Sequence, residues 1–93
     1  MITIKKVVDV MQQVEHPAIR LSLIDLGILT EIELIDNDVV VVFVFPFPHI
    51  PIADQLIHSI EKPINQLGLN LQYQIHTMSF EERQRFLQLE ASA

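Results

Sequence analysis

The chain contains no cysteine. It therefore forms no disulfide, offers no catalytic thiolate and cannot hold a zinc ion or an iron–sulfur cluster through sulfur atoms of its own. A metal ion would have to be held by histidines, by carboxylates or by thiols of a partner. We therefore predict no cofactor.

Basic residues are also scarce, with 6 Lys and Arg against 12 Asp and Glu and a net charge of −6. The largest basic cluster is the pair Lys5 and Lys6. Nucleic-acid binding depends mainly on basic side chains that neutralise phosphates, so we predict no nucleic-acid partner. The simplest explanation of the acidity is solubility.

Long apolar runs are missing as well. None approaches the roughly 18 residues of a membrane span, and no long apolar segment follows the first lysines as it would in a signal peptide. We expect no membrane contact and a cytoplasmic location. The 93 residues are 49% hydrophobic with a mean hydropathy of +0.33. This composition excludes a disordered chain and predicts one small domain over residues 1–93.

The first element that the sequence predicts is a helix over residues 3–14, with Thr3 as its N-cap and Pro17 as its stop signal. Residues 18–27 form a connector that ends at Gly27, one of only two glycines, which marks a backbone conformation that other residues adopt poorly. The apolar face of the helix consists of Ile4, Val7, Val8, Met11 and Val14.

Two strands joined by a turn at residues 36–38 follow. Residues 28–35 alternate as in a half-exposed strand, with Thr30, Ile32 and Leu34 on one side and glutamates on the other. Residues 39–45 are consecutive β-formers, so both faces of this strand must be covered. One face can lie under the helices, and the other needs the C-terminal segment or a second copy of the chain. The side chains that would form an apolar patch if left open are Val39, Val41, Phe43 and Phe45.

A second helix is predicted after the prolines that end this strand, with Ile50 as N-cap, Pro51 as first helical residue and Gly68 as C-terminal stop. Pro63 lies inside it and should kink or fray its last turn. The buried stripe consists of Ile52, Leu56, Ile60, Ile64 and Leu67.

The last two predicted elements are a strand and a helix. Residues 69–77 alternate, with Leu71, Tyr73 and Ile75 opposite two glutamines and His76, and we expect Tyr73 in the core. Ser79 and Glu82 form a capping box that opens a helix over residues 79–90. Its apolar side chains make it a candidate cover for the open face of the sheet; they are Phe80, Phe86, Leu87 and Leu89.

The predicted fold class is therefore α+β, a small two-layer domain in the order helix-strand-strand-helix-strand-helix. Its helices pack on a three-stranded mixed sheet. The third strand follows a helical crossover, so we expect it to lie parallel to one of the first two.

Over residues 4 to about 78, the chain resembles the family once catalogued as domain of unknown function 59. That family includes iron–sulfur assembly factors of the SufT type, the phenylacetate-pathway protein PaaD and the N-terminal domain of some cluster-carrier ATPases. The resemblance implies the same small α/β fold and a role in iron–sulfur cluster assembly. It depends on a hydrophobic-Asp-Leu-Gly turn, a hairpin and a proline at a helix start. The matching positions are Pro17, Ser22, Ile24, Asp25, Leu26, Gly27, Pro51 and Ala53.

The chain departs from this family at the residues that would carry chemistry. Where the family has Asp-Pro-Glu, this sequence has His16-Pro17-Ala18. Pro46 stands in place of the family's threonine at the end of the strand, and Ile50 stands in place of the family's cysteine. A thiol at a helix N-terminus is stabilised as the nucleophilic, metal-binding thiolate. Ile50 can neither ligate nor attack, so a role that needs this sulfur does not transfer to this chain.

The polar residues to test first are His16, Asp25 and His49. By resemblance the segments that hold them lie near one another, and they could form a His/His/carboxylate metal site or an acid–base cluster. The alternative is that both histidines are exposed loop residues and Asp25 caps a turn. Asp54 and His58 are spaced i, i+4 and could bind a metal or make a surface contact. No catalytic residue is predicted, because the serines lack a His/Asp context.

The sequence is compatible with three functions. The first is a non-enzymatic accessory protein related to iron–sulfur assembly factors, which binds a cluster-assembly component or target. The second is a small metal-binding protein or enzyme subunit that uses the His16/Asp25/His49 region. The third is a self-associating module that forms a homodimer through the apolar sheet face.

Overall fold

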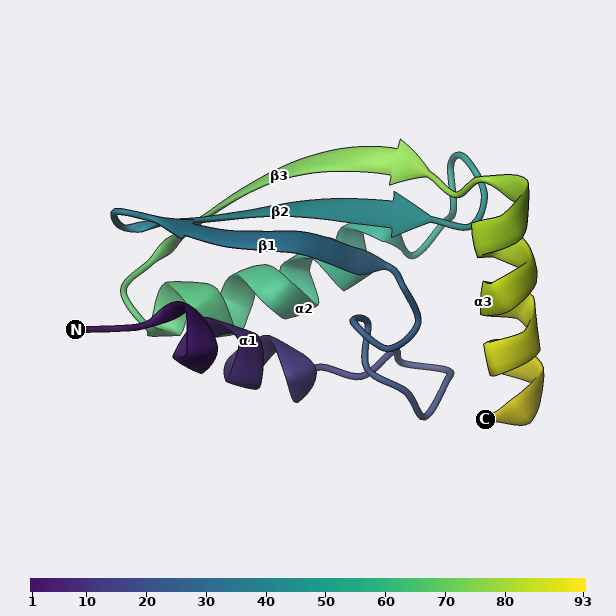
Figure 1. Ribbon diagram of the computed structural model, residues 1–93, viewed down its shortest axis with the longest axis horizontal. Helices are drawn as coiled ribbons and strands as arrows, with labels where there is room; N and C mark the ends of the chain where they lie inside the picture. The colour runs from purple at the N-terminus through teal and green to yellow at the C-terminus, as the bar shows by residue number, and fades with distance from the viewer.

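A computed structural model describes all residues, Met1–Ala93. One layer is a three-stranded sheet in the order β1-β2-β3, and the other is a pair of helices on one of its faces (Figure 1). β1 pairs antiparallel with β2, and β2 pairs parallel with β3, as predicted. The element bounds are α1 Ile4–Gln12, β1 Leu29–Ile35, β2 Asp38–Phe45, α2 Ala53–Gln66, β3 Asn70–Thr77 and α3 Phe80–Ser92. The fold class and the order of elements are confirmed.

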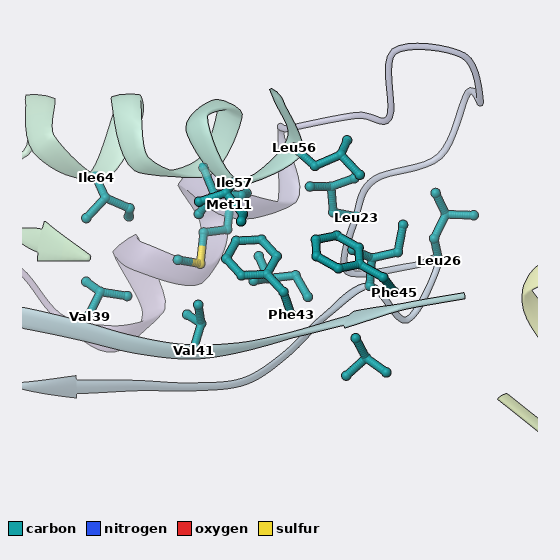
Figure 2. Packing of buried hydrophobic residues seen from close by; sticks show 14 of the residues in the cluster. Met11, Leu23, Leu26, Val39, Val41, Phe43, Phe45, Leu56, Ile57 and Ile64 are labelled. Carbon is teal, nitrogen blue, oxygen red and sulfur yellow. The ribbon is translucent and has the colours of Figure 1, made fainter. Parts of the chain in front are cut away.

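The central strand, β2, presents its apolar side chains to the helices. Val39, Val41 and Phe43 are fully buried and Phe45 nearly so. Figure 2 shows these side chains facing Met11 of α1 and Leu56, Ile57 and Ile64 of α2. Because the helices already cover this face, it is not available as a dimer interface.

The predicted position of the last helix is wrong. α3 stands at one end of the sheet, roughly across the strand direction, and does not lie on the face opposite α1 and α2 (Figure 1). That outer face carries Val40, Val42 and Val44 between polar side chains of the neighbouring strands. Of the apolar side chains of α3, only Phe86 is buried; Phe80 and Leu87 are exposed. The helix therefore has too narrow an apolar stripe to cover a sheet.

The alternation predicted for residues 28–35 is interrupted by a β-bulge. Thr30 pairs with Val42 and Glu33 with Val40, so Glu31 and Ile32 together stand opposite Val41 alone. Glu31 has φ of 51°, the left-handed conformation that such bulges use. As a consequence Thr30 lies on the same face as Glu33, whereas Leu34 pairs with Val39 on the buried face.

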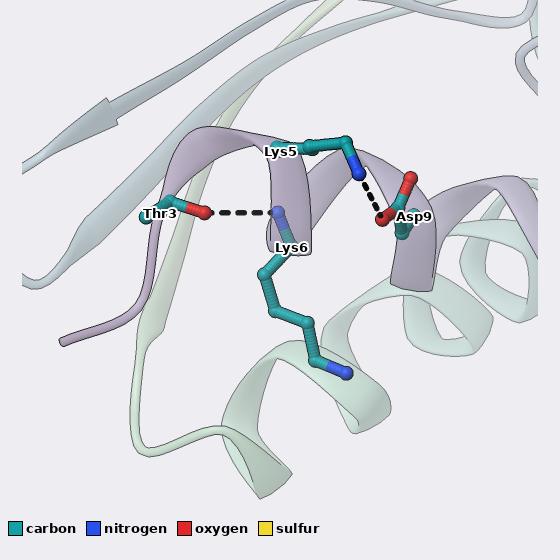
Figure 3. A network of polar contacts seen from close by, with 4 residues as sticks. All are labelled: Thr3, Lys5, Lys6 and Asp9. Carbon is teal, nitrogen blue, oxygen red and sulfur yellow. Dashed lines mark hydrogen bonds and ion pairs between the residues drawn. The ribbon is translucent and has the colours of Figure 1, made fainter.

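The helix ends follow local chemistry. Thr3 caps α1 by accepting a hydrogen bond from the Lys6 N–H at 3.3 Å, and Lys5 and Asp9 form an exposed ion pair at 3.9 Å (Figure 3). Such an exposed pair contributes less than about 1 kcal/mol. The predicted capping box of α3 is confirmed, because Ser79 Oγ accepts from the Glu82 N–H and Glu82 Oε1 accepts from the Ser79 N–H.

The C-terminal end of α2 is a Schellman motif at the predicted stop. Gly68 has φ of 80°, its N–H donates to the Asn65 carbonyl, and the Leu69 N–H donates to the Ile64 carbonyl. Pro63 is accommodated within the helix, which continues to Gln66.

β3 is one of the two edge strands, and its side chains alternate as predicted. Leu71, Tyr73 and Ile75 pair with Val39, Val41 and Phe43 and share their face. Tyr73 contacts Phe43 edge-on, with ring centroids 5.6 Å apart. It is nevertheless 43% exposed, so the prediction of a core position for Tyr73 is wrong. The helix layer does not reach far enough over β3 to enclose it.

None of the helices combines the length and the apolar character that crossing a bilayer would require.

Candidate functional site

An apolar groove of about 310 Å³ lies at the end of the sheet where β2 runs into α2. It is bounded by the loop after β2, the first turn of α2 and one side of α3. The imidazole of His16 and the carboxylate of Glu90 are its ionisable groups. Its hydrophobic lining consists of Ile28, Phe47, Ile50, Ile52, Leu56 and Phe86.

The loop after β2 places Ile50 in this groove. Pro46 is buried, whereas Phe47 is 46% exposed. His49 has φ of 57°, so the chain reverses at this residue before it enters α2. The predicted N-cap is wrong by two residues: Pro51 and Ile52 form a turn, Ile52 is the N-cap, and no side chain caps the helix. The Ala53 N–H donates to the Ile50 carbonyl at 3.3 Å, so Ile50 remains next to the start of the helix.

Arg83 joins the loop after β2 to α3. Its Nε donates to the Pro46 carbonyl at 2.8 Å, and its guanidinium carbon lies 5.2 Å from the centre of the Phe47 ring. Its Nη2 also lies 3.5 Å from the Met78 carbonyl. These contacts hold α3 against the loop, and they leave the buried Phe86 side chain in the groove.

His16 is half-buried at the groove, four residues after the end of α1. Its Nδ1 accepts a hydrogen bond from the Ala18 N–H at 3.0 Å, which places the proton of the neutral ring on Nε2. Burial lowers the pKa of His16 below its usual value of 6.5, because a charged imidazolium would lose hydration there. The Glu90 carboxylate acts in the opposite direction and raises this pKa by a smaller amount.

Asp25 lies in a different place, exposed at the mouth of a second groove of about 260 Å³. Thr30, Glu82 and Arg85 are the other polar residues of this second groove. Asp25 does not accept the capping bond of its turn. Ser22 does this, because its buried Oγ accepts from the Asp25 N–H at 3.0 Å and from Gln12 Nε2 at 2.9 Å.

The structure does not bring the three first-choice residues together. His16 and Asp25 line separate grooves, and His49 is exposed and lines neither. Nowhere in the chain are three or more His, Asp or Glu side chains grouped closely enough to hold a metal ion. Asp54 and His58 do not pair either, since His58 Nδ1 lies 3.8 Å from Glu61 Oε1 instead.

Sequence reasoning identified Ile50 and His16 as positions of interest but missed the groove that joins them. Phe47, Phe86 and Glu90 complete it, and the last two belong to α3. No sequence signal could have placed them, because the weak apolar stripe of α3 does not indicate which surface it contacts. The groove can take up an apolar side chain, and it offers no nucleophile and no set of ligands.

The comparisons with known proteins agree with this fold. The sequence model of the family described as "iron-sulfur cluster assembly protein" matches residues 4–70. Among solved structures, the chain is similar to a domain of unknown function, DUF59, from Bacillus anthracis. The two share 18% sequence identity and a TM-score of 0.62, over 91% of this chain and 89% of that one. No curated protein matches.

This structural likeness concerns the fold alone, because only 18% of the aligned residues are identical. The family match is independent of it and covers most of the chain, from the start of α1 to the start of β3. It also confirms the resemblance drawn from the Asp-Leu-Gly turn and the proline before α2. The chain belongs to the iron–sulfur cluster assembly protein family.

Proposed function

We propose that this chain is a non-enzymatic accessory protein of iron–sulfur cluster assembly that acts by contacting a protein of that pathway and holds no cluster itself. The observation that supports this most directly is Ile50. At the position before α2 where the resemblance places a cysteine, the side chain is aliphatic and lines an apolar groove. An apolar groove in place of a thiol suits recognition of a protein side chain.

The chemistry of the groove favours a protein partner over a small polar substrate. Its lining is aromatic and aliphatic, and aromatic side chains at such sites commonly provide much of the binding energy in protein interfaces. Phe47 is half exposed at its rim, where the Arg83 guanidinium packs over its ring. Glu90 and His16 add polar groups at the edge that can fix the orientation of a partner.

The test of the contact uses purified cluster scaffold, carrier and recipient proteins from the source organism, with binding measured by titration calorimetry. We expect one of them to bind the wild-type chain. Phe47→Asp should weaken this binding at least about tenfold, the loss of one apolar anchor. Leu87→Asp is the matched control, because Leu87 is 37% exposed on α3 and does not line the groove. Absence of binding to every component, or equal loss in both variants, would contradict the proposal.

The second half of the proposal, that the chain holds no cluster, has its own test. The purified chain is incubated anaerobically with ferrous iron, sulfide and a thiol reductant, and then desalted. We expect no visible charge-transfer absorption and no retained iron by elemental analysis. A stoichiometric amount of retained iron would overturn the non-ligating role even if the protein contact were confirmed.

A further inference from the structure

The free edge of β3 has none of the features by which proteins prevent strands from pairing with other chains. β3 is the last strand of the sheet, and its eight residues pair with β2 in an unbroken register. It contains no proline, lysine, arginine, aspartate or glutamate. Every residue except Leu71 is exposed. Edge strands are usually protected by charges, prolines, bulges or a covering element, and a regular uncharged edge is a template for a further strand.

The backbone groups that are free on this edge can be assigned. The Asn70 N–H donates to the Asn37 carbonyl and the Met78 N–H to the Phe45 carbonyl. In a parallel pair, alternate residues turn their backbone toward the same neighbour. Asn70, Gln72, Gln74 and His76 therefore turn theirs toward β2. The residues whose N–H and C=O groups point away from the sheet are Leu71, Tyr73, Ile75 and Thr77.

The same odd-numbered residues carry the exposed apolar side chains. Tyr73 is 43% and Ile75 is 53% exposed, and both lie on the face of the sheet that the helices cover elsewhere. The Tyr73 ring contacts Phe43 edge-on, so an apolar group placed beside Tyr73 would extend the core across the edge. Side chains and free backbone groups thus favour a partner strand with apolar residues at alternate positions.

We propose that the occupant of this edge is a second copy of the same chain, with the two β3 strands pairing antiparallel across a two-fold axis at Gln74. The strand is complementary to itself in this register. Leu71 stands opposite Thr77, and Tyr73 opposite Ile75, of the second copy; these are pairs of residues whose backbone groups are free. The two apolar side chains of each copy meet those of the other on the helix-covered face.

The opposite face of the joined sheet is also compatible with this register. Gln74 meets Gln74 of the second copy on the axis, and Gln72 meets His76, so no two ionisable groups oppose each other. A register shifted by one residue would set outward backbone groups against inward ones. A shift by two residues in either direction keeps the bonding pattern but pairs only three of the four outward-facing residues of β3. The result is an isologous interface that joins two three-stranded sheets into one of six strands. This inference does not depend on the proposed function.

The absence of cysteine makes a direct test simple. Residues opposite each other in a non-hydrogen-bonded antiparallel pair have Cα atoms about 4.5 Å apart, within the range for a disulfide. The axis pair at Gln74 is of this kind. We expect oxidised Gln74→Cys to form a covalent dimer nearly completely, measured by non-reducing electrophoresis. Gln72→Cys is the control on the same strand and face. In this register its two thiols are four residues apart along the strand direction, about 14 Å, and should not react.

A second test uses the assembly state of the unmodified chain and of two matched variants, measured by sedimentation velocity over a range of concentrations. We expect wild-type protein to dimerise, Ile75→Lys to be monomeric, and Ile35→Lys to dimerise like the wild type. Ile35 is 52% exposed at the end of β1, so the control places the same charge at equal exposure on the other edge. A monomeric wild type, equal cross-linking of the two cysteine variants, or a dimer that survives Ile75→Lys would each overturn the proposal.

Discussion

The two edges of the sheet are built in opposite ways. β1 is interrupted by the bulge at Glu31, carries exposed carboxylates at Glu31 and Glu33, and is followed by Asp36, whose φ is 54°. β3 has an unbroken register and contains no Lys, Arg, Asp or Glu. Both sequences alternate apolar and polar residues, so alternation alone does not tell which edge is protected. The protection of β1 comes from backbone shape and charge together.

From this comparison we infer that the chain disfavours the addition of a further strand along β1 and leaves the edge of β3 open to one. A strand added to β1 would meet two carboxylates and a local twist, whereas one added to β3 would meet amides and two exposed apolar side chains. Four predictions test how far this difference extends, and they are ordered by expected size.

The largest effect is expected at Phe43, which supports both edges because it pairs with Leu29 of β1 and with Ile75 of β3. It is fully buried, so Phe43→Ala should lower the free energy of unfolding by about 3–5 kcal/mol through lost burial and a residual cavity. Urea denaturation measures this. Phe80→Ala is the control, since Phe80 is 71% exposed and should change stability by less than about 0.5 kcal/mol. A loss at Phe43 as small as the control would mean that the edges are not joined through this residue.

The next largest effect on stability is expected at the capping box of α3, which follows the end of β3. Thr77 is followed within two residues by the capping box of α3, and Ser79→Ala removes the acceptor of the Glu82 N–H. We expect a loss of about 1 kcal/mol in the free energy of unfolding. Ser92→Ala is the matched control in the same helix, because the Ser92 hydroxyl is exposed and donates only to the Gln88 carbonyl. Equal losses in the two variants would show that the cap does not fix the end of β3.

Glycine substitutions should affect the two edges with opposite sign. Glu31 adopts a left-handed conformation that glycine reaches without strain, so Glu31→Gly should raise the free energy of unfolding by about 0.5 kcal/mol. Gln72 lies in regular strand, where glycine costs about 0.5–1 kcal/mol. Both are measured by urea denaturation at low protein concentration, to keep dimerisation out of the result. Changes of the same sign would show that the bulge stores no strain.

The smallest effect is a pH dependence on the β1 side of the molecule, where His16 precedes the connector to that strand. Burial lowers the pKa of His16 in the folded state, so the unfolded chain binds a proton more readily as the pH falls through about 6.5. The folded state should therefore lose stability on acidification below that pH. The slope of the free energy of unfolding against pH should correspond to the uptake of at most about one proton on unfolding.

The corresponding variant is His16→Asn, which should lack this component of the slope between pH 7.5 and 5.5 while matching the wild-type slope above pH 7.5. Thermal or urea denaturation at each pH provides the comparison. Identical slopes in both proteins throughout the range would mean that His16 is as well hydrated in the folded state as in the unfolded one.

The sequence was sufficient to predict the elements and their order because the signals are local. Val39–Phe45 is a run of β-formers, Ser79 and Glu82 are spaced for a capping box, and Gly27 and Gly68 both take the positive φ that glycine permits. These features depend on residues close together in the chain.

The features that the sequence did not predict depend on contacts between distant segments or on a single backbone torsion. The residue types around Glu31 do not predict a left-handed φ, yet that torsion shifts Thr30 to the outer face of the sheet. Likewise the position of α3 depends on Arg83 reaching the Pro46 carbonyl, 37 residues earlier in the chain. The separation of His16 from Asp25 follows from the path of the connector, which composition does not encode.

The contacts of Arg83 have a consequence for how the groove can move. The Arg83 side chain bonds to the first carbonyl after β2, covers the neighbouring aromatic ring and belongs to the helix that forms the far wall. Loop and wall are thereby linked through this one side chain. A ligand that widens the groove must either break this guanidinium contact or swing the whole C-terminal helix outward, so the width of the groove and the angle of α3 change together.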